Sequence, residues 1–199
     1  MYKRQGPEVP TVLSMRQDYK HDGARPWRGV KRDNWEGGHR VPFIARWPGK
    51  IKPGTRSSQT LSLTDLMATF AAITNVKLAQ GAGEDSVNML PALIGRNEGK
   101  SIRKYTLHQT ISLALAIRRG PWKYLDHRGS GGNNYDRAGR WGMKKYIVPE
   151  KEPEAPGQLY NLDTDPGETN NLYFKRSEIV KELKNKLEEF KKSGRSAPL

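Results

Sequence analysis

The second half of the chain constrains the fold most strongly, because it combines several short strand patterns with one helical pattern. Strand-like segments lie at 104–110, 113–119 and 122–126, and Gly120-Pro121 between the last two is typical of a hairpin turn. A further brief strand is expected at 159–162. These segments together predict a small antiparallel sheet.

The end of the chain predicts an amphipathic helix. Ser177 is a suitable N-cap, and lysines gather in the last turn, where the helix dipole favours cations. Apolar residues recur behind it at helical spacing, namely Ile179, Val180, Leu183, Leu187 and Phe190. We expect this stripe to pack on the sheet. The Gly- and Pro-rich stretch 128–158 before it predicts a long loop or an insertion over a site.

The first half has a different pattern, so we place a domain boundary between 1–99 and 100–199. Residues 1–40 are polar and show no sustained period, which predicts a loop around short elements. The apolar run 41–49 has a proline near each end, which predicts a strand that ends in a Pro-Gly turn.

Two helices are predicted beyond that strand. Ser62 and Asp65 have the spacing of a capping box, and apolar residues follow at helical intervals, so a helix is expected over 63–74. A second, shorter helix is expected over 87–94, with Gly95 at its end.

The composition excludes some kinds of site and does not identify a function. The chain has 199 residues and a net charge of +14, from 35 Lys+Arg against 21 Asp+Glu. Such a charge favours polyanions, but the basic residues are spread along the chain, so a polyanion-attracting face and an ordinary solvated surface both stay open. The absence of cysteine excludes disulfides, thiolate metal sites and a cysteine nucleophile. No apolar window approaches the ~18 residues of a membrane span, and the first residues lack the apolar stretch of a secretory signal.

Several metal and nucleotide motifs fail on inspection. The segment 163–167 resembles the start of a calcium loop, but its glycine comes one place early and Phe174 stands where glutamate is required. Gly81-Ala82-Gly83 lacks the third glycine of a dinucleotide loop. The four histidines show no i, i+4 pairing, so the sequence predicts no metal ligands in this chain.

The segment from Arg28 to Pro42 is the strongest candidate for a functional loop. It brings cations, an acid and glycines together ahead of the predicted strand. Glycine lets a backbone approach a ligand closely, and Lys31 supplies a compact charge for an oxyanion.

In this segment the sequence resembles the sulfatase family. The family signature Lys-x4-Glu-Gly-Gly-x-Arg-x-Pro is matched by Lys31, Glu36, Gly37, Gly38, Arg40 and Pro42. Further family segments resemble 43–51, 63–69, 85–93, 117–124 and 159–172, in family order and over nearly the whole chain.

The resemblance implies an α/β fold like that of alkaline phosphatase, followed by a subdomain with a small antiparallel sheet and a C-terminal helix. This chain would supply the end of the large domain and the whole subdomain. It also implies hydrolysis of sulfate esters, on aryl sulfates or sulfated glycans, by a formylglycine nucleophile and a calcium ion. Lys31 is then the catalytic and substrate-binding residue that holds the sulfate, and Glu36, Gly37, Gly38 and Arg40 form the signature loop.

The sequence also departs from the family. Gly6-Pro7-Glu8 resembles residues that follow an Asp-Asn pair of metal ligands, which puts Arg4 and Gln5 at the ligand positions. We therefore expect a C-terminal fragment, from a truncated or misassigned reading frame, whose partner is a missing N-terminal sulfatase portion. The isolated chain is expected to be inactive and to bind no calcium. By family, the complete enzyme would be periplasmic or secreted, with its export signal upstream.

Two alternatives remain at this stage. One is a non-catalytic scaffold derived from the family. The other is a basic polyanion-binding module in which cations alternate with aromatic rings. Its candidate residues are Arg118, Arg119, Trp122, Lys123, Tyr124, Trp141, Lys144, Lys145 and Tyr146. No base-reading motif accompanies the charge, so specific nucleic-acid binding is not expected, and neither is a membrane partner.

Overall fold

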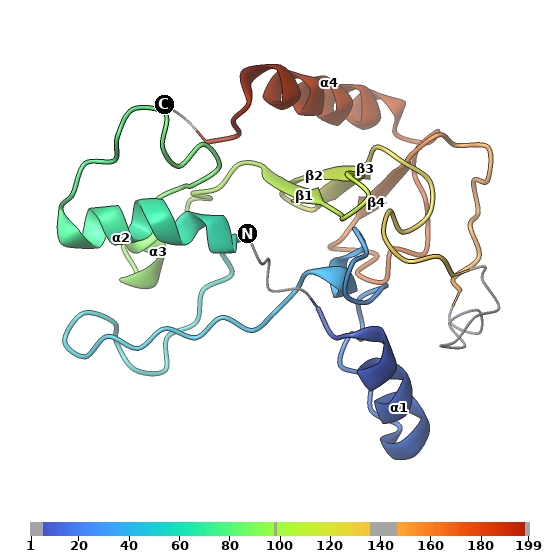
Figure 1. The fold of residues 1–199 in the computed structure, drawn as a ribbon, viewed down its shortest axis with the longest axis horizontal. Helices are drawn as coiled ribbons and strands as arrows, with labels where there is room; N and C mark the ends of the chain where they lie inside the picture. The colour runs from blue at the N-terminus through green and yellow to red at the C-terminus, as the bar shows by residue number, and fades with distance from the viewer. Residues whose placement is uncertain (1–5, 98, 136–146, 198–199) are drawn as a thin grey trace. The chain divides into compact units, whose positions relative to one another are not determined.

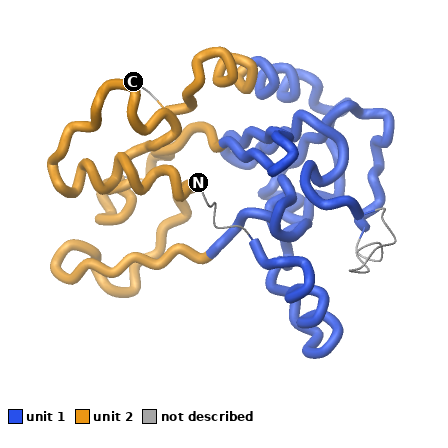
Figure 2. Tube along the Cα trace, viewed as in Figure 1, with its two compact units in different colours: residues 1–41, 107–185 blue, residues 42–106, 186–199 orange. Residues whose placement is uncertain are grey.

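The computed structural model describes residues 6–97, 99–135 and 147–197. The chain divides into two compact units, one formed by Met1–Val41 with Leu107–Asn185 and the other by Pro42–Thr106 with Lys186–Leu199 (Figure 2). The units are thus assembled from separate stretches of sequence. The domain boundary expected at residue 99 concerns a complete sulfatase fold and stays a prediction.

A four-stranded sheet forms the centre of the first unit (Figure 1). Its strands follow chain order, as β1 (Thr106–Gln109), β2 (Leu115–Arg119), β3 (Trp122–Leu125) and β4 (Gln158–Asn161). The pairs β2–β3 and β3–β4 are antiparallel. Gly120 has a φ of +54° in the β2–β3 turn, a conformation that glycine adopts at low cost. The predicted small antiparallel sheet and its hairpin are confirmed.

Apolar residues on this sheet are fully enclosed. Ile117, Leu125 and Leu159 are each 0% exposed, and Tyr124 is 1% exposed. A second group of buried residues joins the sheet to the signature loop through Trp35, which packs with Ala116, Leu125, Tyr160 and Leu162. The sheet therefore supports the loop directly.

The predicted C-terminal helix is α4, Ser177–Ser193. Val180 and Leu183 are buried, as their helical spacing predicts, and Glu182 pairs with Arg119 of β2. Its last turn carries Lys191 and Lys192, beside the carbonyl ends that favour cations.

The first unit also contains a helix that the sequence did not reveal. Helix α1 spans Val9–Tyr19 within the stretch predicted to be a loop. The Glu8 side chain accepts a hydrogen bond from the Val9 amide, and Pro10 lies in the first turn, where a missing N–H has no cost. Val9 and Val12 pack against Val30. The apolar stripe of α1 is short and depends on this tertiary contact, so the periodicity of the sequence gave too weak a signal.

The second unit holds the helices predicted from the capping box. A 3-10 turn at Leu63–Asp65 leads into α2 (Leu66–Thr74), and both hydrogen bonds of the Ser62–Asp65 box are present. The predicted helix over 87–94 is shorter, as α3 (Leu90–Leu93), and Gly95 follows it with a φ of +73°.

The strand predicted over 41–49 is wrong for this chain. Residues 41–47 carry no strand pairing, and Ile44 is 91% exposed. A strand needs a neighbour for its ladder hydrogen bonds, and no described segment pairs with this one. The expected turn at Pro48-Gly49 is present, since the Lys50 and Ile51 amides both donate to the Trp47 carbonyl. Among the described residues, no helix is long and apolar enough to cross a membrane.

Candidate functional site

The signature loop is built around a short 3-10 turn at Glu36–Gly38, whose residues are all buried. The Gly37 amide donates to the Arg28 carbonyl at 2.8 Å, and the Gly38 carbonyl accepts from the Gly6 amide at 2.8 Å. A Cβ on Gly37 would overlap the Gly29 carbonyl, and one on Gly38 would overlap the Asp33 carbonyl. These glycines therefore let backbone pack against backbone, whereas the sequence analysis assigned them to close approach of a ligand.

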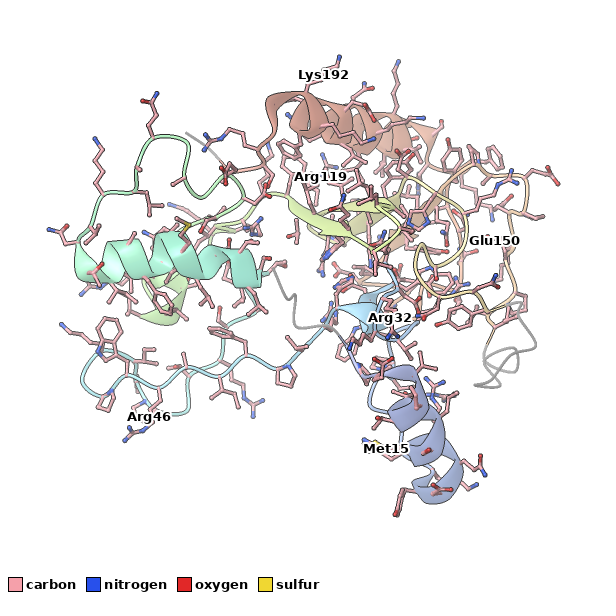
Figure 3. The ribbon with its side chains drawn as sticks, in the orientation of Figure 1. Met15, Arg32, Arg46, Arg119, Glu150 and Lys192 are labelled. Carbon is pink, nitrogen blue, oxygen red and sulfur yellow. The ribbon has the colours of Figure 1, made fainter. Side chains whose placement is uncertain are left out.

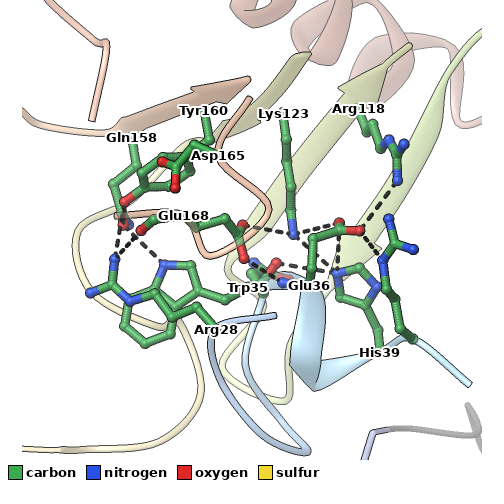
Figure 4. A network of polar contacts seen from close by, with 12 residues as sticks. Arg28, Trp35, Glu36, His39, Arg118, Lys123, Gln158, Tyr160, Asp165 and Glu168 are labelled. Atoms are coloured by element: carbon green, nitrogen blue, oxygen red, sulfur yellow. Dashed lines mark hydrogen bonds and ion pairs between the residues drawn. The ribbon is translucent and has the colours of Figure 1, made fainter. Parts of the chain in front are cut away.

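Glu36 is the anchor of this turn, because it is 1% exposed and surrounded by cations (Figure 4). Its Oε1 accepts from Lys123 Nζ at 2.9 Å, and its Oε2 accepts from Arg40 Nε at 2.6 Å and Arg118 Nη1 at 3.2 Å. Both oxygens thus accept hydrogen bonds from cationic side chains. Glu36 and Arg40, two of the predicted signature residues, are brought together as a structural ion pair.

A second buried carboxylate shares the same lysine. Glu168 Oε1 lies 3.1 Å from Lys123 Nζ, and its Oε2 accepts from the Glu36 amide at 2.6 Å. Lys123 and Glu168 are both 0% exposed. Because a buried charge without a partner is costly, each member of this Glu36–Lys123–Glu168 triad depends on the others.

The two glutamates of the triad have pKa values shifted in opposite directions. Burial would raise the pKa of Glu36, but the charges of Lys123 and Arg118 hold it well below its usual range. Burial dominates at Glu168 and raises its pKa to about 7, with Lys123 opposing and Glu36 adding to the rise. Burial and the Lys123 charge lower the pKa of His39 to about 3, so its ring is neutral.

The described residues include one group with metal-ligand chemistry, Glu36, His39 and His108, whose candidate atoms lie within 4.8 Å of one another. The Lys123 ammonium is 3.1 Å from His39 Nε2 and 2.9 Å from Glu36 Oε1. A cation therefore already stands at this position. Calcium prefers six to eight oxygen ligands, so two imidazoles and one carboxylate that is already paired with cations do not fit it.

Lys31, the predicted sulfate-binding residue, lies apart from the Glu36 network. Its ammonium is 3.0 Å from Glu8 Oε2, and its side chain is 37% exposed. The backbone is fixed on both sides, because the Lys31 amide donates to the Pro7 carbonyl at 2.9 Å and its carbonyl accepts from Asn133 Nδ2 at 2.8 Å. The chain thus offers a partly exposed cation on a well-held turn.

A cavity of about 740 Å³ lies in the same unit, beside Trp35, Tyr135 and the glycine-rich segment 129–132. Its most prominent cation, Arg28, stacks on Trp35 at 3.7 Å and donates to the Tyr160 hydroxyl and the Glu168 carbonyl. These bonds fix Arg28 within the structure, so the cavity adds no free charge from that residue.

The residues of the polyanion-binding alternative do not form a surface among the described residues. Lys123 and Tyr124 are buried, and Arg118 and Arg119 are paired with Glu36 and Glu182. Trp141, Lys144, Lys145 and Tyr146 lie outside the described residues, as do Arg4 and Gln5 at the expected metal-ligand positions.

Comparison with known proteins identifies the family. The sulfatase family profile matches residues 12–76, which include the signature loop. The chain is 34% identical to an N-acetylgalactosamine-6-O-sulfatase of Bacteroides thetaiotaomicron over 165 residues, which is 83% of this chain and 30% of that protein. This chain belongs to the sulfatase family.

Two further matches agree with this membership. Human arylsulfatase G is 40% identical over 69 residues, covering 35% of this chain and 13% of that sulfatase. A solved structure from a study of glycosaminoglycan metabolism by Bacteroides thetaiotaomicron matches with a TM-score of 0.73 and 30% identity, over 90% of this chain and 35% of that one. The expected sulfatase fold is confirmed, and the chain spans about a third of the length of these bacterial sulfatases.

The structure also gives further residues roles that the sequence did not predict. Lys123 and Glu168 lie in segments that resemble sulfatase signatures, yet only their contact with Glu36 gives them a role. Arg32 carried no signal of its own, and Glu8 was visible only as the end of the Gly6-Pro7-Glu8 segment. Their proximity to Lys31 is a product of the fold.

Proposed function

We propose that this chain is the sulfate-holding part of a sulfatase that hydrolyses sulfate esters, with Lys31 as the residue that binds the sulfate group. The observation that supports it is the state of Lys31 itself. The Lys31 side chain is partly exposed, lies on a turn fixed by backbone hydrogen bonds, and already contacts one carboxylate oxygen of Glu8.

A positioned ammonium has a clear use in this reaction. Negative charge on the sulfate oxygens and on the leaving oxygen must be stabilised during cleavage, and a preorganised cation does this without reorganisation. The buried Glu36–Lys123–Glu168 triad serves the same end indirectly, because it fixes the turn that follows Lys31. These residues are positioning residues.

The substrate class that we propose is a sulfated glycan, because an N-acetylgalactosamine-6-O-sulfatase is 34% identical over 83% of this chain. We further propose that the complete enzyme uses the formylglycine and calcium chemistry of the family and works in the periplasm or outside the cell. None of the described residues supplies a group that fits calcium, so those steps would depend on other residues of a complete sulfatase.

The test is substitution of Lys31→Ala in a complete sulfatase that carries this sequence. We expect turnover of a sulfated sugar to fall by on the order of tenfold to a thousandfold, as for the loss of one oxyanion-stabilising contact. Lys52→Ala, which removes an equal charge at an exposed position, is the matched control. Unchanged kinetics in the Lys31→Ala enzyme would restrict Lys31 to its contact with Glu8.

A further inference from the structure

Two neighbouring cations converge on one carboxylate at the start of α1. Lys31 Nζ lies 3.0 Å from Glu8 Oε2, and Arg32 donates from Nη1 to Oε1 at 2.6 Å and from Nη2 to Oε2 at 3.1 Å. Figure 3 shows Arg32 near the first turn of α1. An ammonium beside a guanidinium fork is the arrangement with which proteins hold oxyanions.

The backbone departs from its usual conformation to make this arrangement. Arg32 has a φ of +85°, a strained region that residues other than glycine rarely adopt. The strain is held by neighbours on both sides, because Asn133 Nδ2 donates to the Lys31 carbonyl and Asp33 Oδ2 accepts from the Val30 amide. Both cationic side chains thereby reach the same carboxylate.

The charge and exposure of the cluster leave the two cations accessible to an anion that competes with Glu8. Two cations face a single carboxylate, and the side chains of Lys31, Arg32 and Glu8 are 37%, 40% and 33% exposed. Burial acts to raise the pKa of Glu8, but hydrogen bonds from Arg32 and Lys31 outweigh it and lower the pKa to about 2. Glu8 is therefore ionised throughout the ordinary pH range and does not release the cations by protonation.

We propose that Lys31 and Arg32 together form a two-cation oxyanion site, which Glu8 occupies as an internal competitor until a sulfate displaces its carboxylate. The identity of the anion rests on the proposed function, but the competition does not, because it follows from the contacts of Glu8. Arg32 then holds the substrate sulfate beside Lys31. Glu8 sets the affinity of the two-cation site for sulfate, because its carboxylate must first be displaced.

The test uses the full 199-residue chain and inorganic sulfate, with affinity measured by calorimetry and by the NMR shift of the lysine side chains. Glu8→Gln should bind sulfate at least about threefold more tightly than the wild type, since an exposed ion pair no longer competes. Its amide oxygen still accepts from the Val9 amide, so α1 should keep its start. Adding Lys31→Ala or Arg32→Ala to Glu8→Gln should remove most of the gain.

The matched control is Glu154→Gln, which makes the same change in charge at another exposed glutamate and should leave sulfate affinity unchanged. If Glu8→Gln loses helix content, Glu8→Asp provides the second variant. It retains the cap but withdraws the carboxylate by one methylene, so it too should tighten binding. Sulfate affinity equal to that of the wild type in a folded Glu8 variant would overturn the proposal.

The failure of this proposal and of the proposed function are distinguishable. Sulfate binding that depends on Glu8 in the chain, without sulfate-ester turnover in the complete protein, would refute only the function. Loss of turnover in the Lys31→Ala enzyme, without any effect of Glu8 on sulfate affinity, would refute only the internal competitor.

Discussion

At the scale of single residues, Glu168 gives the chain an unusual pH dependence. Its pKa is raised to about 7 in the folded protein by burial, from 4.5 in an unfolded chain. The folded state therefore binds the proton more tightly, and the stability from this group is present below pH 4.5 and lost as the pH rises through 7. Glu168→Gln should remove this loss, so its free energy of unfolding should fall less between pH 5 and pH 8 than that of the wild type.

Denaturant unfolding at the two pH values measures this difference. Glu152→Gln is a suitable control, because Glu152 is only partly buried and its substitution should leave the pH dependence as in the wild type. A Glu168→Gln variant with the same slope as the wild type would show that Glu168 stays ionised beside Lys123 across this range.

At the scale of elements, the ion pair of Asp65 and Arg103 joins the start of α2 to the segment before β1. The two side chains are 3% and 2% exposed, and Asp65 also accepts from the Ser62 and Val87 amides at 2.8 and 2.9 Å. One carboxylate thus completes a helix cap, holds the segment before α3 and neutralises a buried guanidinium. Asp65→Asn should lower the free energy of unfolding by about 3–5 kcal/mol, because it leaves Arg103 buried without its counter-charge.

The measurement is urea unfolding followed by circular dichroism, with Asp163→Asn on an exposed turn as the control. A double-mutant cycle with Arg103→Gln gives the interaction energy of the Asp65–Arg103 pair. Once Asp65→Asn is present, adding Arg103→Gln should lower the free energy of unfolding by much less than the first substitution does. A loss below about 1 kcal/mol for Asp65→Asn would mean that the cap and the ion pair are replaceable by water.

At the scale of the whole molecule, the chain carries the signature loop of a sulfatase but spans only about a third of its bacterial relatives. It has no cysteine for conversion to a formylglycine, and its described residues offer no group that fits calcium. We expect the purified 199-residue chain to release no sulfate from an aryl sulfate or a sulfated sugar, with or without added calcium. Metal-dependent turnover well above background would reveal a catalytic group elsewhere in the chain.

Local patterns in the sequence determined much of this protein. The hairpin at Gly120-Pro121, the capping box at Ser62 and Asp65, and the helix beginning at Ser177 all form where their residues predict, because each depends on neighbours close in sequence. The sulfatase signature around Lys31 was visible for the same reason, since its residues are contiguous.

The tertiary structure alone decided the rest. Helix α1 forms because Val9 and Val12 pack against Val30. The segment 41–47 forms no strand, because a strand requires a neighbouring strand for its hydrogen bonds. Glu36 meets Lys123 across 87 residues of sequence and Glu168 across 132, distances at which no periodicity carries information. Burial raises the pKa of Glu168, whereas at Glu36 the charge of Lys123 and its neighbours outweighs burial and lowers the pKa. The strained turn at Arg32 brings a second cation to Glu8. The ionisation of a side chain in a folded protein depends on its burial and on the charges near it, and only the fold sets both.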